Sequence, residues 1–325
     1  MPVLCPTERV EFQSRGIRCA AWLTLPVSGD HIHSDLCTRD RGGRGQGCTN
    51  RGAGGHHPAV VLVHGLGATH DMMLAQYEQH FAAAGIAVLA FDYRYTGASE
   101  GQPRQRISMR SQRDDVDAAL AHLRTRPEID SERLGLWGTS LGGMNVVRVA
   151  ATRTDLAAAV VQCPIVHGPG AARSLGVLGA VRLTPAIVVD ALRAVTGRGR
   201  RYVPIVGAPG SDAMVTAPGA EAGWNSTVPS GATFDNRIAA ADAVAMVVTS
   251  ALRQARHVSA PLLVCVCDRE NLMDPKFAAL VARRAPKGVA RHYDSDHFAI
   301  YHPPLVREVL ADQTAFLKEH LDVAS

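Results

Sequence analysis

The sequence lacks the features that mark membrane-spanning and secreted proteins. Its apolar runs are strand-sized and bounded by Gly, Pro or charge, so none approaches the length of a membrane span. The first nine residues show no basic segment followed by a continuous apolar one, as a signal peptide would. We therefore expect a chain with no membrane span and no secretory leader.

The sequence also has little net charge, few aromatic side chains and no regular cysteine spacing. The formal net charge of +4 over 325 residues is small and aromatics make up 5%, so the basic, aromatic-rich surface of a nucleic-acid-binding protein is not expected. The seven cysteines are odd in number and scattered. Cys265 and Cys267 lie two apart in a strand-like run and are predicted to be small buried residues. A reducing cytoplasm is the simplest setting.

Hydrophobic residues, at 46%, are numerous enough for a large core, but one stretch near the N-terminus is excluded from it. Residues 28–57 are rich in Gly, Arg and His with almost no apolar side chain, which predicts a flexible surface loop. It contains Cys37, Cys48, His56 and His57, whose spacing matches no tight zinc pattern. We therefore predict no metal site.

Apolar strand-like and amphipathic helix-like segments alternate along most of the chain. A hairpin is predicted over residues 10–25. Further strands are predicted over residues 59–64, 86–91, 133–138, 156–162, 262–267 and 289–293, and helices over residues 77–84, 110–124, 141–152, 276–284 and 305–321. Such alternation implies right-handed crossovers, hence an α/β fold with a mostly parallel central sheet and helices on both faces.

The alternation breaks between residues 164 and 256. This stretch is rich in Ala, Gly and Pro, with helical pieces over residues 185–195 and 238–253 and no clear strand. It is interpreted as a helical cap insertion over the sheet edge, within a core formed by residues 1–163 and 257–325.

A candidate nucleophile lies between a predicted strand and a predicted helix. The pentapeptide Gly138-Thr139-Ser140-Leu141-Gly142 fits the Gly-x-Ser-x-Gly pattern, which alone is only suggestive. A buried strand leads into it and a helix leads out, which is the setting of a nucleophile elbow. Ser140 is therefore predicted to be a catalytic serine.

A serine hydroxyl needs a base, and in this type of fold the base is a histidine near the C-terminus. His292, His302 and His320 are available, but His297 follows the last strand, in the loop that returns over the sheet edge. His297 is the predicted base.

The acid that orients the histidine is expected after the strand ending at Cys267. Asp268 and Glu270 compete there, with Asp274 more distant. Asp is the commoner residue in this role, so chemistry alone favours Asp268.

Backbone donors for a tetrahedral oxyanion are expected at two places. One is the N–H of Leu141 at the start of the helix, and the other is the N–H of Leu66 in His64-Gly65-Leu66-Gly67. His64 is expected to pack in that loop. Neither a metal nor an organic cofactor is implied.

Together these residues resemble the α/β-hydrolase superfamily over most of the chain. The matching pieces are His64-Gly65-Leu66-Gly67, Phe91-Asp92-Tyr93-Arg94-Tyr95-Thr96-Gly97-Ala98-Ser99, the Ser140 pentapeptide and Asp296-His297-Phe298. The chain looks similar to dienelactone hydrolases and X-Pro-peptidase-like bacterial esterases. Alignment to that pattern implies Glu270 as the acid, with Asp274 at the usual proline position and Asp268 as the alternative.

The resemblance implies a serine hydrolase that cleaves a small-molecule carboxylic ester or thioester through an acyl-enzyme on Ser140. The alternatives are a peptidase, a C–C hydrolase or an acyltransferase using the same triad, or a non-catalytic binding protein on this fold. A homo-oligomer is compatible with the sequence.

Overall fold

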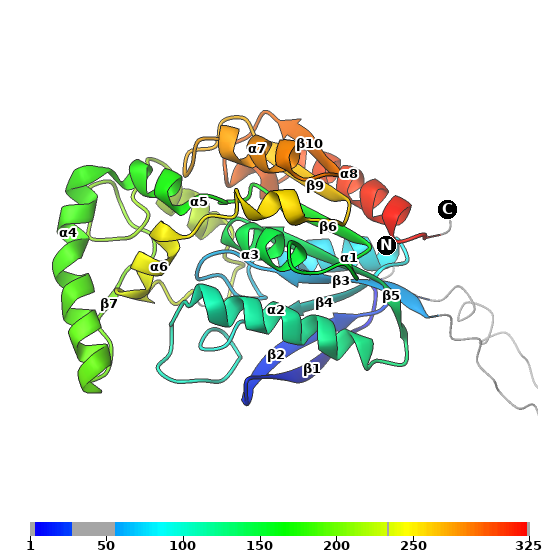
Figure 1. Ribbon diagram of the computed structural model, residues 1–325, viewed down its shortest axis with the longest axis horizontal. Helices are drawn as coiled ribbons and strands as arrows, with labels where there is room; N and C mark the ends of the chain where they lie inside the picture. The colour runs from blue at the N-terminus through cyan, green and yellow to red at the C-terminus, as the bar shows by residue number, and fades with distance from the viewer. Residues whose placement is uncertain (1–3, 28–55, 233, 324–325) are drawn as a thin grey trace, which may run out of the picture.

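The computed structural model describes residues 4–27, 56–232 and 234–323. Its centre is an eight-stranded sheet in the order β1-β2-β4-β3-β5-β6-β9-β10, with helices on both faces (Figure 1). β1 pairs with β2, and β2 with β4, in antiparallel fashion, and all later neighbours are parallel. This is the mostly parallel α/β architecture predicted from the sequence.

The strands and helices fall close to the predicted segments. The sheet contains β1 (Thr7–Ser14), β2 (Ile17–Thr24), β3 (His57–Val63), β4 (Ala87–Phe91), β5 (Ile129–Thr139), β6 (Ala158–Gln162), β9 (Leu262–Cys267) and β10 (Gly288–Tyr293). The helices around it are α1 (Leu74–Ala83), α2 (Met109–Arg124), α3 (Leu141–Ala150), α7 (Lys276–Arg284) and α8 (Leu305–His320). Residues 28–55 of the predicted loop lie outside the described residues, and His57 is the first residue of β3.

Alternate side chains of each central strand supply two separate cores, as a strand covered on both faces requires. In β3, Val61 and Val63 belong to the core that includes side chains of α2, α3 and α7, whereas Val60 and Leu62 belong to the core that includes side chains of α1 and α8. The continuous apolar run in the sequence is therefore explained by burial on both faces.

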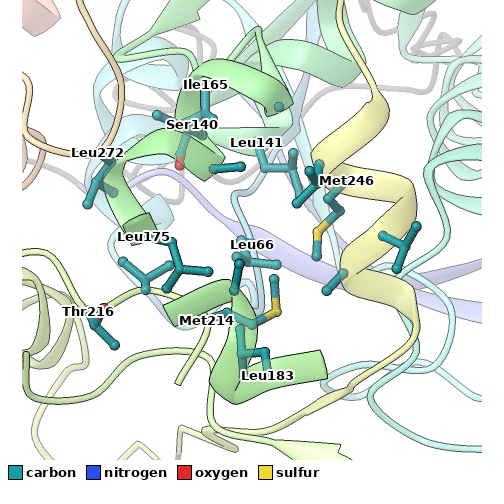
Figure 2. Close-up of a pocket in the computed structure, with 18 of the residues that line it drawn as sticks. Leu66, Ser140, Leu141, Ile165, Leu175, Leu183, Met214, Thr216, Met246 and Leu272 are labelled. Carbon is teal, nitrogen blue, oxygen red and sulfur yellow. The ribbon is translucent and has the colours of Figure 1, made fainter. Parts of the chain in front are cut away.

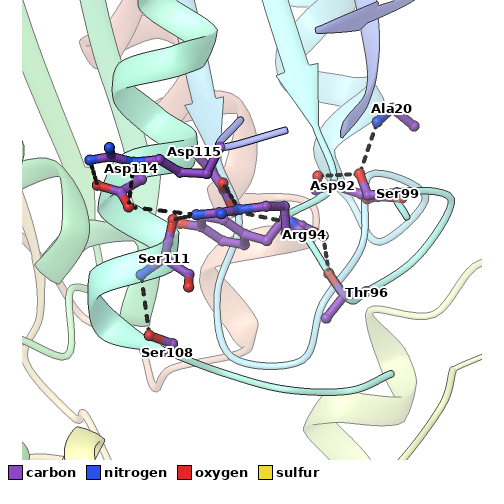
Figure 3. A network of polar contacts seen from close by, with 11 residues as sticks. Ala20, Asp92, Arg94, Thr96, Ser99, Ser108, Ser111, Asp114 and Asp115 are labelled. Atoms are coloured by element: carbon purple, nitrogen blue, oxygen red, sulfur yellow. Dashed lines mark hydrogen bonds and ion pairs between the residues drawn. The ribbon is translucent and has the colours of Figure 1, made fainter. Parts of the chain in front are cut away.

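A buried ion pair and a set of hydrogen bonds fix the loop that follows β4. Arg94 and Asp115, both almost fully buried, form an ion pair, and Asp115 also accepts the Arg94 backbone N–H at 3.1 Å (Figure 3). On the other side of the same loop, the Ser99 hydroxyl donates to the Asp92 carbonyl and accepts the Ala20 N–H. Residues 92–99 are thus joined to both α2 and β2.

The segment between β6 and β9, called the cap segment below, contains α4 (Gly168–Thr196), β7 (Tyr202–Val203), α5 (Ala220–Ser226), β8 (Ile238–Ala239), α6 (Asp242–Val248) and a 3-10 turn η3 (Gln254–His257). Two predictions are wrong here. A short antiparallel pair, β7 with β8, is present where no strand was expected. The predicted helix over residues 238–253 is only α6, because Ile238 and Ala239 pair with residues more than thirty positions away and Thr249 is extended.

Charged residues hold the cap segment together and join it to the core. Arg200 donates to both Asp190 of α4 and Asp242 of α6, and all three side chains are largely buried. Asp242 also accepts the backbone N–H of Ile107 at 2.8 Å. Carboxylates that are widely spaced in the sequence therefore converge on one guanidinium.

α4 is longer and more exposed than predicted. It runs along the end of the molecule farthest from the C-terminal helix (Figure 1) and is interrupted at Gly176, whose φ of 71° and ψ of 171° are not helical. Within its Leu175–Thr196 portion, an 18-residue window has a mean hydropathy of 1.7, and only 17% of that window is buried. By length and composition alone this portion could cross a membrane, which the apolar runs did not indicate because Arg182, Asp190 and Arg193 interrupt it.

Candidate active site

Ser140 lies in a sharp turn between β5 and α3. Its φ of 54° and ψ of −124° are unusual for a residue with a side chain. The turn requires glycine nearby, because a Cβ on Gly142 would lie 2.2 Å from the Val63 carbonyl oxygen. The predicted strand–turn–helix setting is therefore present, with the Ser140 hydroxyl at the carboxyl end of the parallel strands.

His297 and Glu270 reach Ser140 from two other loops. His297 Nε2 lies 3.1 Å from Ser140 Oγ, and His297 Nδ1 lies 2.7 Å from Glu270 Oε2. Both partner side chains are almost fully buried. The other carboxylate oxygen, Oε1, accepts the Leu272 backbone N–H at 2.9 Å, which fixes the orientation of the carboxylate. The result is one hydrogen-bonded line from serine to histidine to carboxylate.

The charge of Glu270 controls the basicity of His297. Burial by itself lowers the pKa of an imidazole, but the adjacent Glu270 carboxylate, with smaller contributions from Cys163 and Asp296, acts in the opposite direction and prevails. The pKa of His297 is thereby raised to about 9. The imidazolium that forms when a histidine accepts a proton is thus stabilised in this site.

The other candidate residues lie elsewhere. Asp268 accepts a hydrogen bond from His292 at 2.7 Å, and both side chains are about half exposed. Asp274 pairs with Lys276 on the surface, and His302 contacts Ser226 of α5. None of these groups joins the line through Ser140.

The loop that follows β3 also lies against Ser140. A Cβ on Gly65 would lie 3.0 Å from the Ser140 Cβ, so the backbone approaches the serine closely. The Leu141 N–H belongs to the first turn of α3, where N–H groups have no partner within the helix. Leu66 lines the same cavity as Ser140 and Leu141.

Two polar residues hold this loop in place. Asp92 accepts the His70 N–H with Oδ1 and the Ala98 N–H with Oδ2, both at 2.7 Å. His64 is buried, hydrogen-bonds the Gly65 carbonyl at 3.0 Å and packs edge-on against Tyr93. Burial lowers the pKa of His64, which is consistent with the packing role expected for it.

A cavity of about 320 Å³ opens at Ser140 and extends beneath the cap segment (Figure 2). Figure 2 shows Ser140 at one end, with Leu183 and Met214 at the other. Its lining is apolar apart from Ser140, Thr184 and Thr216, and includes no charged side chain. A smaller cavity of about 50 Å³ shares Ser140 and Leu66 with it and is lined further by His297, Phe298 and Tyr301.

The sequence did not reveal which cap residues line the large cavity. Leu183 and Ile187 of α4, Met214 after β7 and Met246 of α6 all do so. In the sequence these residues are indistinguishable from others that pack the cap segment or face solvent, because the signal depends on how α4 and α6 lie over Ser140.

A protein-family model described as serine aminopeptidase, S33, matches residues 54–299 of the chain. The chain belongs to the serine aminopeptidase S33 family of α/β-hydrolases. The S33 match spans β3 to the loop after β10, and so includes Ser140, Glu270 and His297. The narrower likeness to dienelactone hydrolases stays an expectation.

Relatives of this S33 chain carry names that describe different activities. The quorum-quenching protein AidA of Acinetobacter baumannii (strain MDR-ZJ06) is 32% identical over 97% of this chain and 95% of its own length. The thiohydrolase aneE of Aspergillus aculeatus is 36% identical over 34% of this chain and 35% of its own length. Among solved structures, the α/β-hydrolase GrgF from Penicillium sp. sh18 has a TM-score of 0.77 at 21% identity, covering 98% and 99% of the two chains. At that identity the likeness shows the fold alone.

Proposed function

We propose that Ser140, His297 and Glu270 form a catalytic triad that hydrolyses a carboxylic ester or thioester through an acyl-enzyme. The single observation that carries this proposal is the position of His297, whose two ring nitrogens lie within hydrogen-bonding distance of Ser140 and Glu270. Base, nucleophile and orienting acid are thus aligned as acyl transfer requires.

In the first half-reaction the Ser140 oxygen attacks the substrate carbonyl carbon while His297 Nε2 takes the hydroxyl proton. Glu270 stabilises the imidazolium and keeps the ring oriented. The Leu66 and Leu141 N–H groups are proposed to donate to the carbonyl oxygen as its negative charge develops. When the tetrahedral intermediate collapses, His297 gives the proton to the departing alcohol or thiol.

In the second half-reaction water replaces the leaving group. His297 takes a proton from water as the water oxygen attacks the acyl carbon, and Ser140 then leaves with that proton. The products are the free acid and the unmodified enzyme. Both halves use the same three side chains, so no further reacting group is required.

The predicted insertion over residues 164–256, which makes up most of the cap segment, is proposed to shape the acyl side of the substrate. The 320 Å³ cavity has room for about ten water-sized units, which suits an aliphatic acyl group of medium length. The small cavity beside His297 and Tyr301 is proposed to take the part that leaves as alcohol or thiol.

An aminopeptidase reaction, as the family description names, fits this site less well. Recognition of a free amino terminus needs a carboxylate near the substrate, and the residues lining the large cavity include none. In the cap segment, Asp190 and Asp242 are both engaged by Arg200. The apolar lining therefore favours an ester or thioester.

The test is active-site labelling with a fluorophosphonate, followed by turnover of p-nitrophenyl esters and acyl thioesters. Wild type should label stoichiometrically, and Ser140→Ala should neither label nor turn over. Ser131→Ala, at the opposite end of β5, is the matched control and should behave as wild type. A wild-type protein that does not label, or a Ser140→Ala protein that does, contradicts the proposal.

A further inference from the structure

The outer face of α4 is apolar and unusually exposed. From Val177 to Val195, seven Val and Leu side chains have exposures between 42% and 89%. They are Val177, Leu178, Val181, Val188, Val189, Leu192 and Val195. A monomeric protein in water rarely presents a continuous apolar surface of this extent, so the outer face of α4 is expected to be covered.

The spacing of these side chains indicates what covers them. Leu178, Val181, Val188, Leu192 and Val195 follow the alternating three- and four-residue steps of a helix–helix seam, with Pro185 at the intervening position. The opposite side of α4 is the one packed on the protein, since Leu183 and Asp190, seven residues apart, are buried. The exposed stripe therefore points directly away from the body and suits a second helix.

The area of the stripe matches what a stable dimer needs. At roughly 100 Å² for a fully exposed Val or Leu side chain, the seven residues present on the order of 500 Å² of apolar surface. A homodimer interface of standard size buries about 800 Å² on each copy, of which about two thirds is apolar. The stripe supplies that apolar share without help from other elements.

The purely aliphatic composition of the stripe favours a second copy over a lipid surface. Arg173, Arg182 and Arg193 of α4 are exposed, but none of them occupies a position of the seam, and Asp190 is buried with Arg200. Helices that lie on membranes usually carry a Trp or Phe on the apolar face, whereas the 29 residues of α4 include no aromatic residue. An uncharged aliphatic stripe is complementary to itself across a two-fold axis.

We propose that the outer face of α4 pairs with the same face of a second copy of the chain, so that the protein is a homodimer joined through its cap segments. This proposal does not depend on the chemistry proposed for Ser140. It does have a consequence for the substrate, because Leu183 and Ile187 on the inner side of α4 line the large cavity. The partner copy would support that wall from outside.

The test measures molecular mass by size-exclusion chromatography with light scattering at about 50 μM, far above the Kd expected of a standard interface. Wild type should have twice the 34.6 kDa mass of one chain. The double variant Val188→Glu, Leu192→Glu should have the single-chain mass. Val289→Glu, the same change at a half-exposed position of β10, is the matched control and should remain a dimer.

Unfolding temperatures distinguish loss of the dimer from loss of the fold. The double variant should still unfold cooperatively and should still label with a fluorophosphonate if wild type does. The proposal is overturned if wild type has the mass of one chain. It is also overturned if the Val188→Glu, Leu192→Glu variant still has the mass of two chains. Wild type that is monomeric and floats with phosphatidylglycerol vesicles overturns it in favour of a lipid surface.

Discussion

Glu270 and Asp268 stand two residues apart after β9, yet only Glu270 reaches His297. Its Oε2 lies 2.7 Å from His297 Nδ1, whereas Asp268 pairs with His292 at the half-exposed surface. The longer glutamate side chain spans the gap between the two loops, and the backbone N–H of Leu272 holds its carboxylate in place.

The first prediction concerns these two carboxylates. Glu270→Gln should lower kcat for p-nitrophenyl esters by about a thousandfold or more, because His297 loses the charge that orients it and stabilises its imidazolium. Asp268→Asn should leave kcat within about threefold of wild type, since substitutions of surface residues that do not contact the catalytic groups have small effects. A larger loss for Asp268→Asn would assign the acid to the other residue.

The second prediction concerns pH. His297 acts as a base only when neutral, and its pKa is raised to about 9, so kcat/KM should rise with pH and level off only above that value. In Glu270→Gln the largest effect that raises this pKa is lost while burial still lowers it, so the midpoint should shift to lower pH. The measurement is kcat/KM against pH with an uncharged ester. Equal midpoints in the two proteins would show that Glu270 does not set the basicity of His297.

The third prediction concerns the length of the acyl group. Ala243 of α6 lines the large cavity, so Ala243→Phe should shorten the space available to the substrate. We expect kcat/KM for an octanoate ester to fall at least tenfold, because each methylene that no longer fits forfeits about 0.8 kcal/mol, while acetate turnover changes little. Ala245→Phe, on the exposed side of α6, is the matched control. An equal loss for both ester lengths would argue against the cavity as the acyl site.

The fourth prediction concerns stability. Asp115→Asn leaves the buried Arg94 guanidinium with only its longer contact to Asp114, at 3.8 Å, and should lower the free energy of unfolding by about 3 kcal/mol. Glu11→Gln, which removes an exposed ion pair with Arg18, is the control and should cost less than about 1 kcal/mol. Urea unfolding of both variants measures the difference. Similar losses would mean that burial of the Arg94 pair is not the decisive factor.

Much of the core was predictable because its signals are local. The β-branched run of β3 and the Gly-x-Ser-x-Gly turn each predict their own conformation, and parallel strands then bring their carboxyl ends together. Chemistry favoured Asp268 and only the family resemblance implied Glu270, since the choice depends on how far two loops lie from each other.

The cap segment was predicted less well for the same reason. Ile238 and Ala239 resemble the start of a helix, but their backbone pairs with Tyr202 and Val203. No local sequence pattern predicts this pairing. The exposure of α4 was also invisible, because its alternation of Val, Leu and Ala fits a buried helix as well as an uncovered one.

The backbone of Ser140 has one further consequence. A non-glycine residue held at φ 54° and ψ −124° destabilises the folded state by about 1–3 kcal/mol, while glycine adopts that conformation freely. Ser140→Gly and Ser140→Ala lose the same hydroxyl, so comparing their unfolding temperatures isolates the backbone contribution. We expect the glycine variant to be the more heat-resistant of the two, and a lower melting temperature for it would contradict the strain. The residue proposed to be the nucleophile is then also a residue at which glycine would stabilise the fold while abolishing the proposed turnover.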